Sequence, residues 1–450
     1  MGNLLTSLLS AAGAMTAYER SLGVVQNNVS NASTPGYVTQ RQVLVAKSFQ
    51  PAAGLSGGVD LGEIISSRDQ FAEHAVRRQQ EEYGRSAQQR ADLSRLELLF
   101  DATGETGVPG ALSKFFQTTS SWAVAPNDTT ARQSVIDQAD ALAQSFRQTA
   151  AGLMGASADT DQAIKSTVAN VNRLAANIRD FNEQVRTNAS NANDAGLDAS
   201  IHQALEDLAE YTDFTALQQA DGTFTILLGG QTPLVVGARQ YALSTAITDQ
   251  KVQVLDSESR DITDQVHRGR LSSLLETKNQ LIPEYLGGLN RLAASVADRV
   301  NAVLATGADP ADPHPLFTYT SADLVAATLA VTAIRPVELA SAPPTEPGGN
   351  SNVLALVGLA SSTEIDGFTF AGFFGNLGGS LGRSLDSAKE RSALQEQLLA
   401  QARSLRTEVS GVSLNEEAVR MMEFQRSYQA AAKMVTVLDE LTVTLLNMVR

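Results

Sequence analysis

The chain contains 450 residues, with 34 lysine and arginine residues against 49 aspartate and glutamate residues, and no cysteine. This length predicts about two to four domains, and a composition of 43% apolar and 18% charged residues excludes wholesale disorder. The absence of cysteine excludes disulfides, thiolate zinc sites, iron–sulfur clusters and cysteine nucleophiles. The net charge of −15 argues against a nucleic-acid partner, and the apolar runs are far shorter than the roughly 20 residues that span a bilayer.

The N-terminal segment is apolar like a secretory signal peptide but lacks the positive charge that precedes the apolar stretch of such a peptide. Residues 1–15 are apolar, but the first basic residue is Arg20. Because a secretory signal carries positive charge before its apolar stretch, we expect that the protein, if it leaves the cell, keeps this segment uncleaved.

The same segment is predicted to form a helix that ends in a turn. Its apolar residues recur at heptad spacing, which is typical of a helix that packs against another helix. The helix should end in the run rich in asparagine and serine after Asn27, where Pro35 pushes Thr34 out of the α region and Gly36 permits a turn. The heptad stripe consists of Leu5, Leu8, Ala12, Met15, Leu22 and Val29.

Beyond this turn, the pattern predicts a strand pair and then a series of helices. Residues 37–45 alternate like a strand, and residues 58–65 look like its partner. Helical periodicity follows at 68–100, 108–123, 128–155, 158–190 and 198–211.

A small β segment then interrupts the helices. Gly229-Gly230 is the predicted hairpin turn among its short strands. Helix returns at 270–305, and the proline-rich stretch 308–349 is predicted to be rich in loops. The predicted strands are residues 223–228, 234–236, 241–243 and 252–255.

The C-terminal part, from Leu385 to Arg450, is again predicted to be helical, with an interruption near Ser410-Gly411. Ser413 and Glu416 have the spacing of a capping box that would start the last helix. Small residues line the stripes of both terminal helices, and we expect these two helices to pair closely with each other. The C-terminal stripe consists of Met421, Phe424, Tyr428, Ala431, Val435, Leu438, Leu441, Leu445 and Met448.

The polar residues form no convincing catalytic or metal-binding pattern. The acid pairs Glu81-Glu82 and Glu416-Glu417 lie on predicted helices, where adjacent residues point to different sides, so paired acid and base catalysis is not expected. Each histidine is isolated and is predicted to lie on the surface rather than to bind a metal. The histidines are His74, His202, His267 and His314.

Two further segments resemble functional sites, but a structural role explains each of them better. Gly375–Gly379 resembles a phosphate-binding loop but lacks its lysine and strand context, and is interpreted as a flexible turn. Phe115-Phe116 and Trp122 are spaced as core anchors on one helix rather than as a sugar platform. The sequence therefore predicts no enzyme, no catalytic or metal-binding residue and no cofactor.

Two motifs at opposite ends of the chain resemble those of the bacterial flagellar axial proteins, which comprise rod, hook and hook-associated subunits. The first runs from Leu22 to Tyr37 and includes Asn27, Asn28, Asn31, Pro35 and Gly36. The second is Gly411–Glu417 followed by the run that begins Phe424-Gln425 and contains Tyr428. Mid-chain segments are most similar to those of the hook-associated subunits at the junction between hook and filament: Leu96–Phe100, Phe115-Phe116, Pro126–Asp128 with Arg132, and Gly269–Leu275.

The resemblance implies a structural subunit that forms the hook–filament junction by helical self-assembly. It implies as partners other copies of the chain, hook protein below, a second hook-associated protein above and a flagellar export chaperone, with no nucleic acid and no membrane insertion. It also implies an extracellular location in the flagellum, reached by type III export. Alternatives are another axial subunit such as hook or distal rod protein, a secreted enzyme on a helical scaffold, and a signalling coiled coil.

The expected fold is mainly α with small β parts, in an elongated multi-domain chain. We expect residues 1–55 and 411–450 to be the two halves of a terminal helical domain, and 56–212 and 264–410 the halves of a helical middle domain, with 213–263 as a small β insertion. The predicted assembly interface takes residues from both stripes and both motifs: Leu5, Leu8, Ala12, Met15, Leu22, Asn27, Asn28, Val29, Asn31, Pro35, Gly36, Tyr37, Phe424, Gln425, Tyr428, Ala431, Val435, Leu438, Leu441, Leu445 and Met448.

Overall fold

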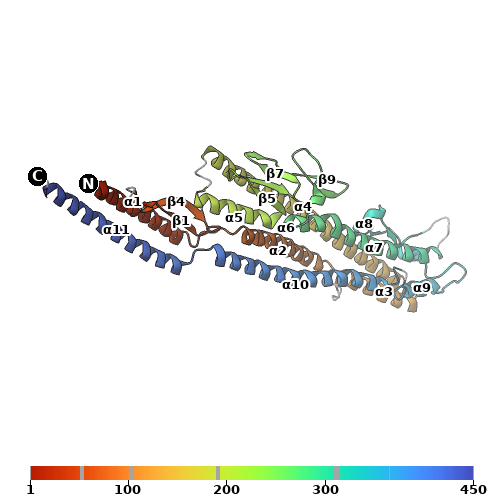
Figure 1. Cartoon of the computed structure of the whole chain (residues 1–450). Coiled ribbons are helices and arrows are strands. Elements are labelled where there is room, and N and C mark those ends of the chain that lie inside the picture. Colours follow the sequence, from red (N-terminus) through yellow and green to blue (C-terminus); the bar gives the residue numbers. More distant parts are fainter. Residues whose placement is uncertain are drawn as a thin grey trace.

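The computed structural model describes residues 2–50, 55–100, 106–188, 193–307, 314–363 and 365–448. The molecule is elongated, and both ends of the chain lie at the same end of it (Figure 1). We call the part formed by the first helix, the following hairpin and the last helix the terminal rod, and residues 70–410 the body. The predicted fold class, mainly α with small β parts, is confirmed.

The terminal rod pairs the two ends of the chain. Helices α1 (Gly2–Ser30) and α11 (Leu414–Met448) lie side by side and run antiparallel, so their predicted pairing is confirmed. Strands β1 (Gln40–Ala46) and β4 (Val59–Ser66) pair as predicted and form a hairpin that packs on α1. Short strands β2 (Phe49–Gln50) and β3 (Leu55–Ser56) extend this hairpin.

The body is built from long helices that pack lengthwise. Its N-terminal helices are α2 (Gln70–Glu97), α3 (Gly107–Val124), α4 (Thr129–Thr187) and α5 (Ala195–Tyr211). The predicted break of α4 near residue 156 is wrong, because this segment is one continuous helix of 59 residues. Its interior Gly152 lies where a Cβ atom would come within 2.6 Å of Leu99 Cδ2, so close packing rather than a break accounts for the glycine.

The returning helices complete the body. The predicted helix 270–305 is present as α6 (Gly269–Glu276), a π-helical turn (Thr277–Leu281) and α7 (Ile282–Ala305). The loop-rich stretch contains the short elements β11 (Phe317–Thr318), α8 (Val325–Thr328) and β12 (Ala330–Val331), and its residues 308–313 lie outside the described residues. Helix α9 (Ser351–Leu359) precedes the last body helix, α10 (Phe370–Ser410).

The expected start of the C-terminal helical region at Leu385 and the flexible turn at Gly375–Gly379 are both wrong. Helix α10 begins at Phe370 and includes all five residues of the supposed turn. Phe373 and Phe374 are buried on the core-facing side of this helix, together with Leu381. Burial of these large side chains outweighs the low helix propensity of the glycines.

Two apolar cores stabilise the body. The first lies among α3, the N-terminal half of α4, α7, α9 and the start of α10, and it contains the predicted anchors Phe115, Phe116 and Trp122. The second lies among the C-terminal half of α4, α5, α6 and the β region. Because α4 contributes to both cores, it connects the two halves of the body.

The β region lies beside α4 and α5 (Figure 1). Strands β5 (Phe214–Gln218), β6 (Phe224–Leu228), β7 (Thr232–Val236) and β8 (Arg239–Gln240) form one antiparallel sheet, and β9 (Ser244–Thr248) pairs with β10 (Lys251–Leu255). The predicted turn at Gly229-Gly230 joins β6 to β7, with φ of 55° and 76°. The expected strand at 241–243 is wrong, and β5 and β9 were not predicted from the sequence.

Candidate assembly interface

The two helices of the terminal rod meet along a seam of small side chains. On α1, residues at heptad spacing lie toward α11, among them Ala11, Ala14 and Tyr18. The Tyr18 ring lies 6.4 Å from the Phe424 ring of α11, measured between centroids. Small residues at such positions let two helix backbones approach closely.

The predicted stripe on α1 is not this seam, which is a correction to the sequence analysis. The seam residues precede the stripe residues by one position, so the larger apolar side chains lie on the flank of the helix. Leu5 is 61% exposed, Ala12 and Val29 are also exposed, and Leu8, Met15 and Leu22 are half-buried. Apolar periodicity finds the stripe of large residues, whereas the groove between the helices is lined on α1 by small ones.

On α11 the predicted stripe lies on the less exposed side of the helix over most of its length. Ala431 is buried, and the stripe residues on either side of it are half-buried: Met421, Phe424, Tyr428, Val435 and Leu438. Toward the C-terminal tip the same stripe is exposed at Leu441, Leu445 and Met448, the last with 77% of its surface accessible. The rod therefore presents apolar surface on α1 and at the tip of α11 that the chain itself does not cover.

A groove runs between α1, the start of β4 and α11. Its volume is about 870 Å³, and its walls are mostly apolar. They include Ala11, Ala14, Val59, Ala431, Met434 and Leu438. The groove and the exposed apolar residues are both part of the terminal rod.

At the base of the rod, a buried polar contact joins the two terminal motifs. The Asn28 side chain is fully buried, and its Nδ2 donates to Gln40 O at 2.9 Å and to Glu417 Oε2 at 3.0 Å. Its Oδ1 accepts from the Tyr37 hydroxyl at 2.9 Å and from Gln40 N at 3.0 Å. Burial, with the nearby Glu417 carboxylate, raises the pKa of Tyr37 to about 12, so its hydroxyl remains a donor near neutral pH.

The turn after α1 docks the rod onto the body. Asn31 Nδ2 donates to Asn27 O at 3.0 Å and stabilises the end of the helix. Gly36 has φ of 75°, and a Cβ atom there would come within 2.4 Å of Ala199 O on α5, so this contact requires glycine. The remaining motif residues, Asn27, Pro35 and Gln425, are exposed.

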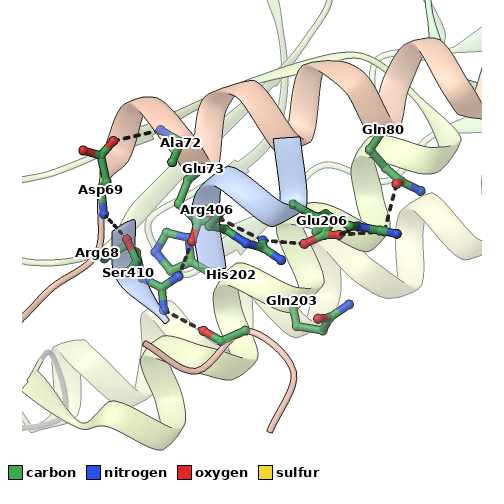
Figure 2. Close-up of polar contacts among 12 residues, drawn as sticks. Arg68, Asp69, Ala72, Glu73, Gln80, His202, Gln203, Glu206, Arg406 and Ser410 are labelled. Atoms are coloured by element: carbon green, nitrogen blue, oxygen red, sulfur yellow. Dashed lines mark hydrogen bonds and ion pairs between the residues drawn. The ribbon is translucent and has the colours of Figure 1, made fainter. Parts of the chain in front are cut away.

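A network of charged side chains built around two buried glutamates lies where the rod meets the body, and the sequence did not predict it (Figure 2). Arg68 Nη2 lies 2.6 Å from Asp198 Oδ2 and donates to Gly36 O at 2.8 Å. Arg406 Nη1 lies 2.6 Å from Glu206 Oε2 and 3.4 Å from Glu73 Oε2. We call this set the neck network, which comprises Arg68, Glu73, Asp198, Glu206, Arg403 and Arg406.

The neck network ties together α2, α5 and α10, which are distant in sequence. Glu73 and Glu206 are both buried, so each carboxylate depends on its arginine partners. The expected surface position of His202 is wrong, because it is buried beside this network with Nε2 3.5 Å from Asp198 Oδ1. Burial, with repulsion from Arg68, Arg77 and Arg406, lowers the pKa of His202 well below its ordinary value, so the ring is neutral.

The described residues offer no catalytic arrangement at these positions. No group of three or more histidine, aspartate or glutamate side chains among them is placed to hold a metal ion. In the same ranges of the chain, no helix combines the length and apolar character needed to cross a membrane. The expected divergence of the acid pairs is wrong for Glu81 and Glu82, which both lie 3.2 Å from the Arg268 guanidinium. Glu417 is buried while Glu416 is exposed, but both form ion pairs with Arg420.

Comparisons with known proteins agree on one family. Residues 93–314 match the family model of the flagellar hook-associated protein FlgK helical domain, and residues 403–448 match that of the flagellar basal body rod FlgEFG protein C-terminal region. The chain is 25% identical to flagellar hook-associated protein 1 of Bacillus subtilis in an alignment of 500 positions that covers 99% of both chains. It is also 25% identical to the protein of that name from Salmonella typhimurium, over 68% of this chain and 58% of the relative.

The fold has a counterpart among solved structures. The flagellar hook junction protein FlgK of Burkholderia pseudomallei superposes with a TM-score of 0.66, covering 74% of this chain and 99% of that one. The sequences are 14% identical, so this likeness concerns the fold.

Proposed function

Because the chain belongs to the bacterial flagellar axial proteins and is most like flagellar hook-associated protein 1, we propose that it acts as a structural subunit of the hook–filament junction. The family consists of structural components of the flagellum and not of enzymes. The observation that carries the proposal is the terminal rod, which pairs both family motifs yet leaves large apolar side chains exposed.

The exposed face of the rod supports assembly through repeated contacts between copies. Four large apolar residues of the rod are exposed: Leu5 and Leu9 on α1, and Leu441 and Met448 on α11. None of them lines the groove between the two helices. A rod that binds one neighbour through its α1 flank and another through its α11 tip makes heterologous contacts, which propagate around a ring or along a helix. All the predicted interface residues belong to this rod or to the turn that docks it.

The proposed position at the junction also implies which proteins the subunit contacts. Within the flagellar axial structure, the proposal places hook protein below the subunit and a second hook-associated protein above it, with other copies at its sides. Before assembly, an export chaperone would cover apolar surface of the terminal helices. The location is extracellular, after type III export without cleavage of the N-terminal segment.

We further propose the domain division expected from the sequence, with one boundary moved because β4 pairs with β1 and packs on α1. The first half of the terminal domain then extends to Ser66 rather than to residue 55, its second half is 411–450, and the rest of 56–212 with 264–410 forms the helical middle domain. The β insertion, residues 213–263, shares its apolar core with α4, α5 and α6. It therefore packs as part of the middle domain and is not a separate module.

The experiment that tests the proposal is localisation of the subunit in isolated hook–basal bodies. Antibody labelling of an epitope-tagged chain should decorate the distal end of the hook, and a deletion strain should secrete filament subunits without building filaments. Label along the whole hook or in the rod would instead support another axial subunit. That alternative has one observation in its favour, since residues 403–448 match the basal body rod family.

A further inference from the structure

A pocket lined by three arginines lies close to the neck network. Its volume is about 300 Å³, and it lies between α2, strand β5 and the segment that leads into α6. Arg77 and Arg78 come from α2, and Arg268 comes from the segment before α6. Glu81 is the one acidic residue among the described residues that line this pocket, which we call the arginine pocket.

The neck network balances its own charges without Arg77. It contains three arginines and three carboxylates, and its Glu73, one helical turn before Arg77, forms ion pairs with Arg68 and Arg406. Burial lowers the pKa of Arg77, although the nearby Glu73 and Glu81 act against this effect. Repulsion from Arg68 and Arg406 lowers it further. Arg77 is therefore a surplus cation beside a network that is already neutral.

The carboxylate of the arginine pocket is also paired already. Glu81 Oε2 lies 3.2 Å from Arg268 Nη1, and Arg268 Nε lies 3.2 Å from Glu82 Oε1. Arg77 Nη1, by contrast, is buried and has no hydrogen-bond partner among the described residues. A buried guanidinium N–H without an acceptor is costly, so this atom points to an acceptor from outside the chain. The next residue, Arg78, is exposed to solvent, so an anion can reach the pocket.

We propose that the arginine pocket binds a small tetrahedral oxyanion with two negative charges, such as sulfate or phosphate, held by Arg77 and Arg78. Two guanidinium groups match two negative charges, and the planar donors of arginine suit the oxygens of such an anion. His74, one turn before both arginines, lines the same pocket. Burial and the charge of Arg77 lower the pKa of His74, so near neutral pH its ring is uncharged and its N–H donates.

The bound anion joins parts of the body that are distant in sequence. Its arginine donors lie on α2, whereas Phe214 and Ala216 of β5 also line the pocket. An oxyanion that bonds to α2 and lies against β5 stabilises the contact between α2 and the β insertion. The site belongs to the body, so it goes beyond the junction role and stands or falls independently of where the subunit is located.

Sulfate is the probe, because it keeps both negative charges throughout the neutral pH range. Isothermal titration calorimetry of the purified full-length chain at pH 7 measures its dissociation constant, with sulfate exchanged for chloride at constant ionic strength so that general screening does not change. We expect a dissociation constant of about 1 mM. Acetate, a carboxylate with a single charge, should bind about tenfold more weakly.

Three single substitutions on α2 test the role of the arginines. Arg77→Gln and Arg78→Gln should each raise the dissociation constant for sulfate about tenfold, as the loss of a charge-assisted hydrogen-bond donor implies. Arg90→Gln is the matched control and should keep it, because Arg90 is an exposed arginine of the same helix outside the pocket. Arg78 is also exposed, so its substitution leaves the fold intact even if Arg77→Gln does not.

A fourth variant tests the sign of the charge effect. Glu81→Gln removes the negative charge from the pocket wall and releases Arg268 from its ion pair, so this variant should bind sulfate more tightly than the unsubstituted chain. Weaker binding by Glu81→Gln would overturn the proposal.

The remaining outcomes are equally decisive. The proposal is overturned if the unsubstituted chain binds no sulfate up to about 10 mM, or if acetate binds as tightly as sulfate. An unchanged affinity in Arg78→Gln, or in a folded Arg77→Gln, also overturns it. So does an equal weakening in Arg90→Gln, because binding would then follow the net charge of the helix and not the pocket.

Discussion

The terminal rod and the body bury their apolar residues to different extents. In the body, aromatic and aliphatic side chains such as Phe146, Leu142 and Leu289 are fully buried in the first of its two cores. In the rod, small residues occupy the seam, while Leu5, Leu9 and Met448 are exposed. The rod thus leaves large apolar side chains exposed to solvent, whereas the body buries its own in apolar cores. The difference indicates that the body folds from its own contacts and that the rod reaches its full stability only among neighbours.

The largest expected effect is the loss of assembly when charge enters the rod. Leu438 is half-buried and lines the groove, so Leu438→Asp puts a charge into the mostly apolar surface where α1 and α11 pair. We expect the chain to be exported but absent from hooks, with filament subunits lost to the medium, as checked by electron microscopy of hook–basal bodies. Leu354→Asp on α9, at an exposed leucine of the body, is the control and should assemble normally. Normal motility of Leu438→Asp would mean that the seam is not needed.

The next effect concerns the body alone. Phe146→Ala should lower its free energy of unfolding by about 3–5 kcal/mol, because this fully buried ring leaves a cavity in the first core. Met448→Ala at the exposed tip should change it by less than about 0.5 kcal/mol. Urea unfolding followed by the fluorescence of Trp122, the one tryptophan of the chain, reports this core directly. Equal effects of the two substitutions would contradict the division into rod and body.

The neck network should matter less than the core but more than surface charge. Arg406→Ala leaves the buried Glu73 and Glu206 with fewer partners and should destabilise the body by about 3 kcal/mol. Lys389→Ala on the same helix removes an exposed ion pair with Asp386 and should cost less than about 1 kcal/mol. The urea midpoints of the two variants check this order. Similar midpoints would show that the network contributes no more than an ordinary surface pair.

The smallest expected effect is a pH dependence of body stability. Burial, opposed by a hydrogen bond from Arg268, raises the pKa of Glu81 from 4.5 to about 7. Between these two pH values the folded state holds this proton and the unfolded state does not, so stability should fall as pH rises from about 4.5 to about 7. Glu81→Gln, which resembles the protonated form, should raise the unfolding temperature at pH 8 by about 2–4 °C and leave it nearly unchanged at pH 4. An equal shift at both pH values would exclude titration of Glu81 as the cause.

Periodicity predicted the helices of the body well, because their apolar faces are buried against neighbours within the chain. The hairpin of β1 and β4 and the turn at Gly229-Gly230 were likewise readable, since alternation and glycine turns are local signals. The extent of α10 was missed at Gly375–Gly379, where tertiary burial of neighbouring phenylalanines overrides local propensity.

The candidate site was predictable in location but not in its contacts. The terminal motifs identified the rod, yet the heptad stripe of α1 pointed at Leu5, Leu8 and Met15, while the seam lies one position earlier. Under the proposed function, the stripe is apolar because it contacts neighbouring subunits. The neck network gave no pattern along the sequence, because Arg68, Asp198 and Arg406 come from three distant segments and meet only after folding.

Helix α4 has a mechanical consequence for a subunit placed between a turning hook and a filament. At 1.5 Å per residue, its 59 residues form a shaft about 90 Å long with an unbroken ladder of backbone hydrogen bonds. Val135 to Leu153 are fixed in one core and Ile164 to Val185 in the other. Torque applied to one half of the body is therefore transmitted to the other half by rotation of a single stiff element, without flexing at a joint between them.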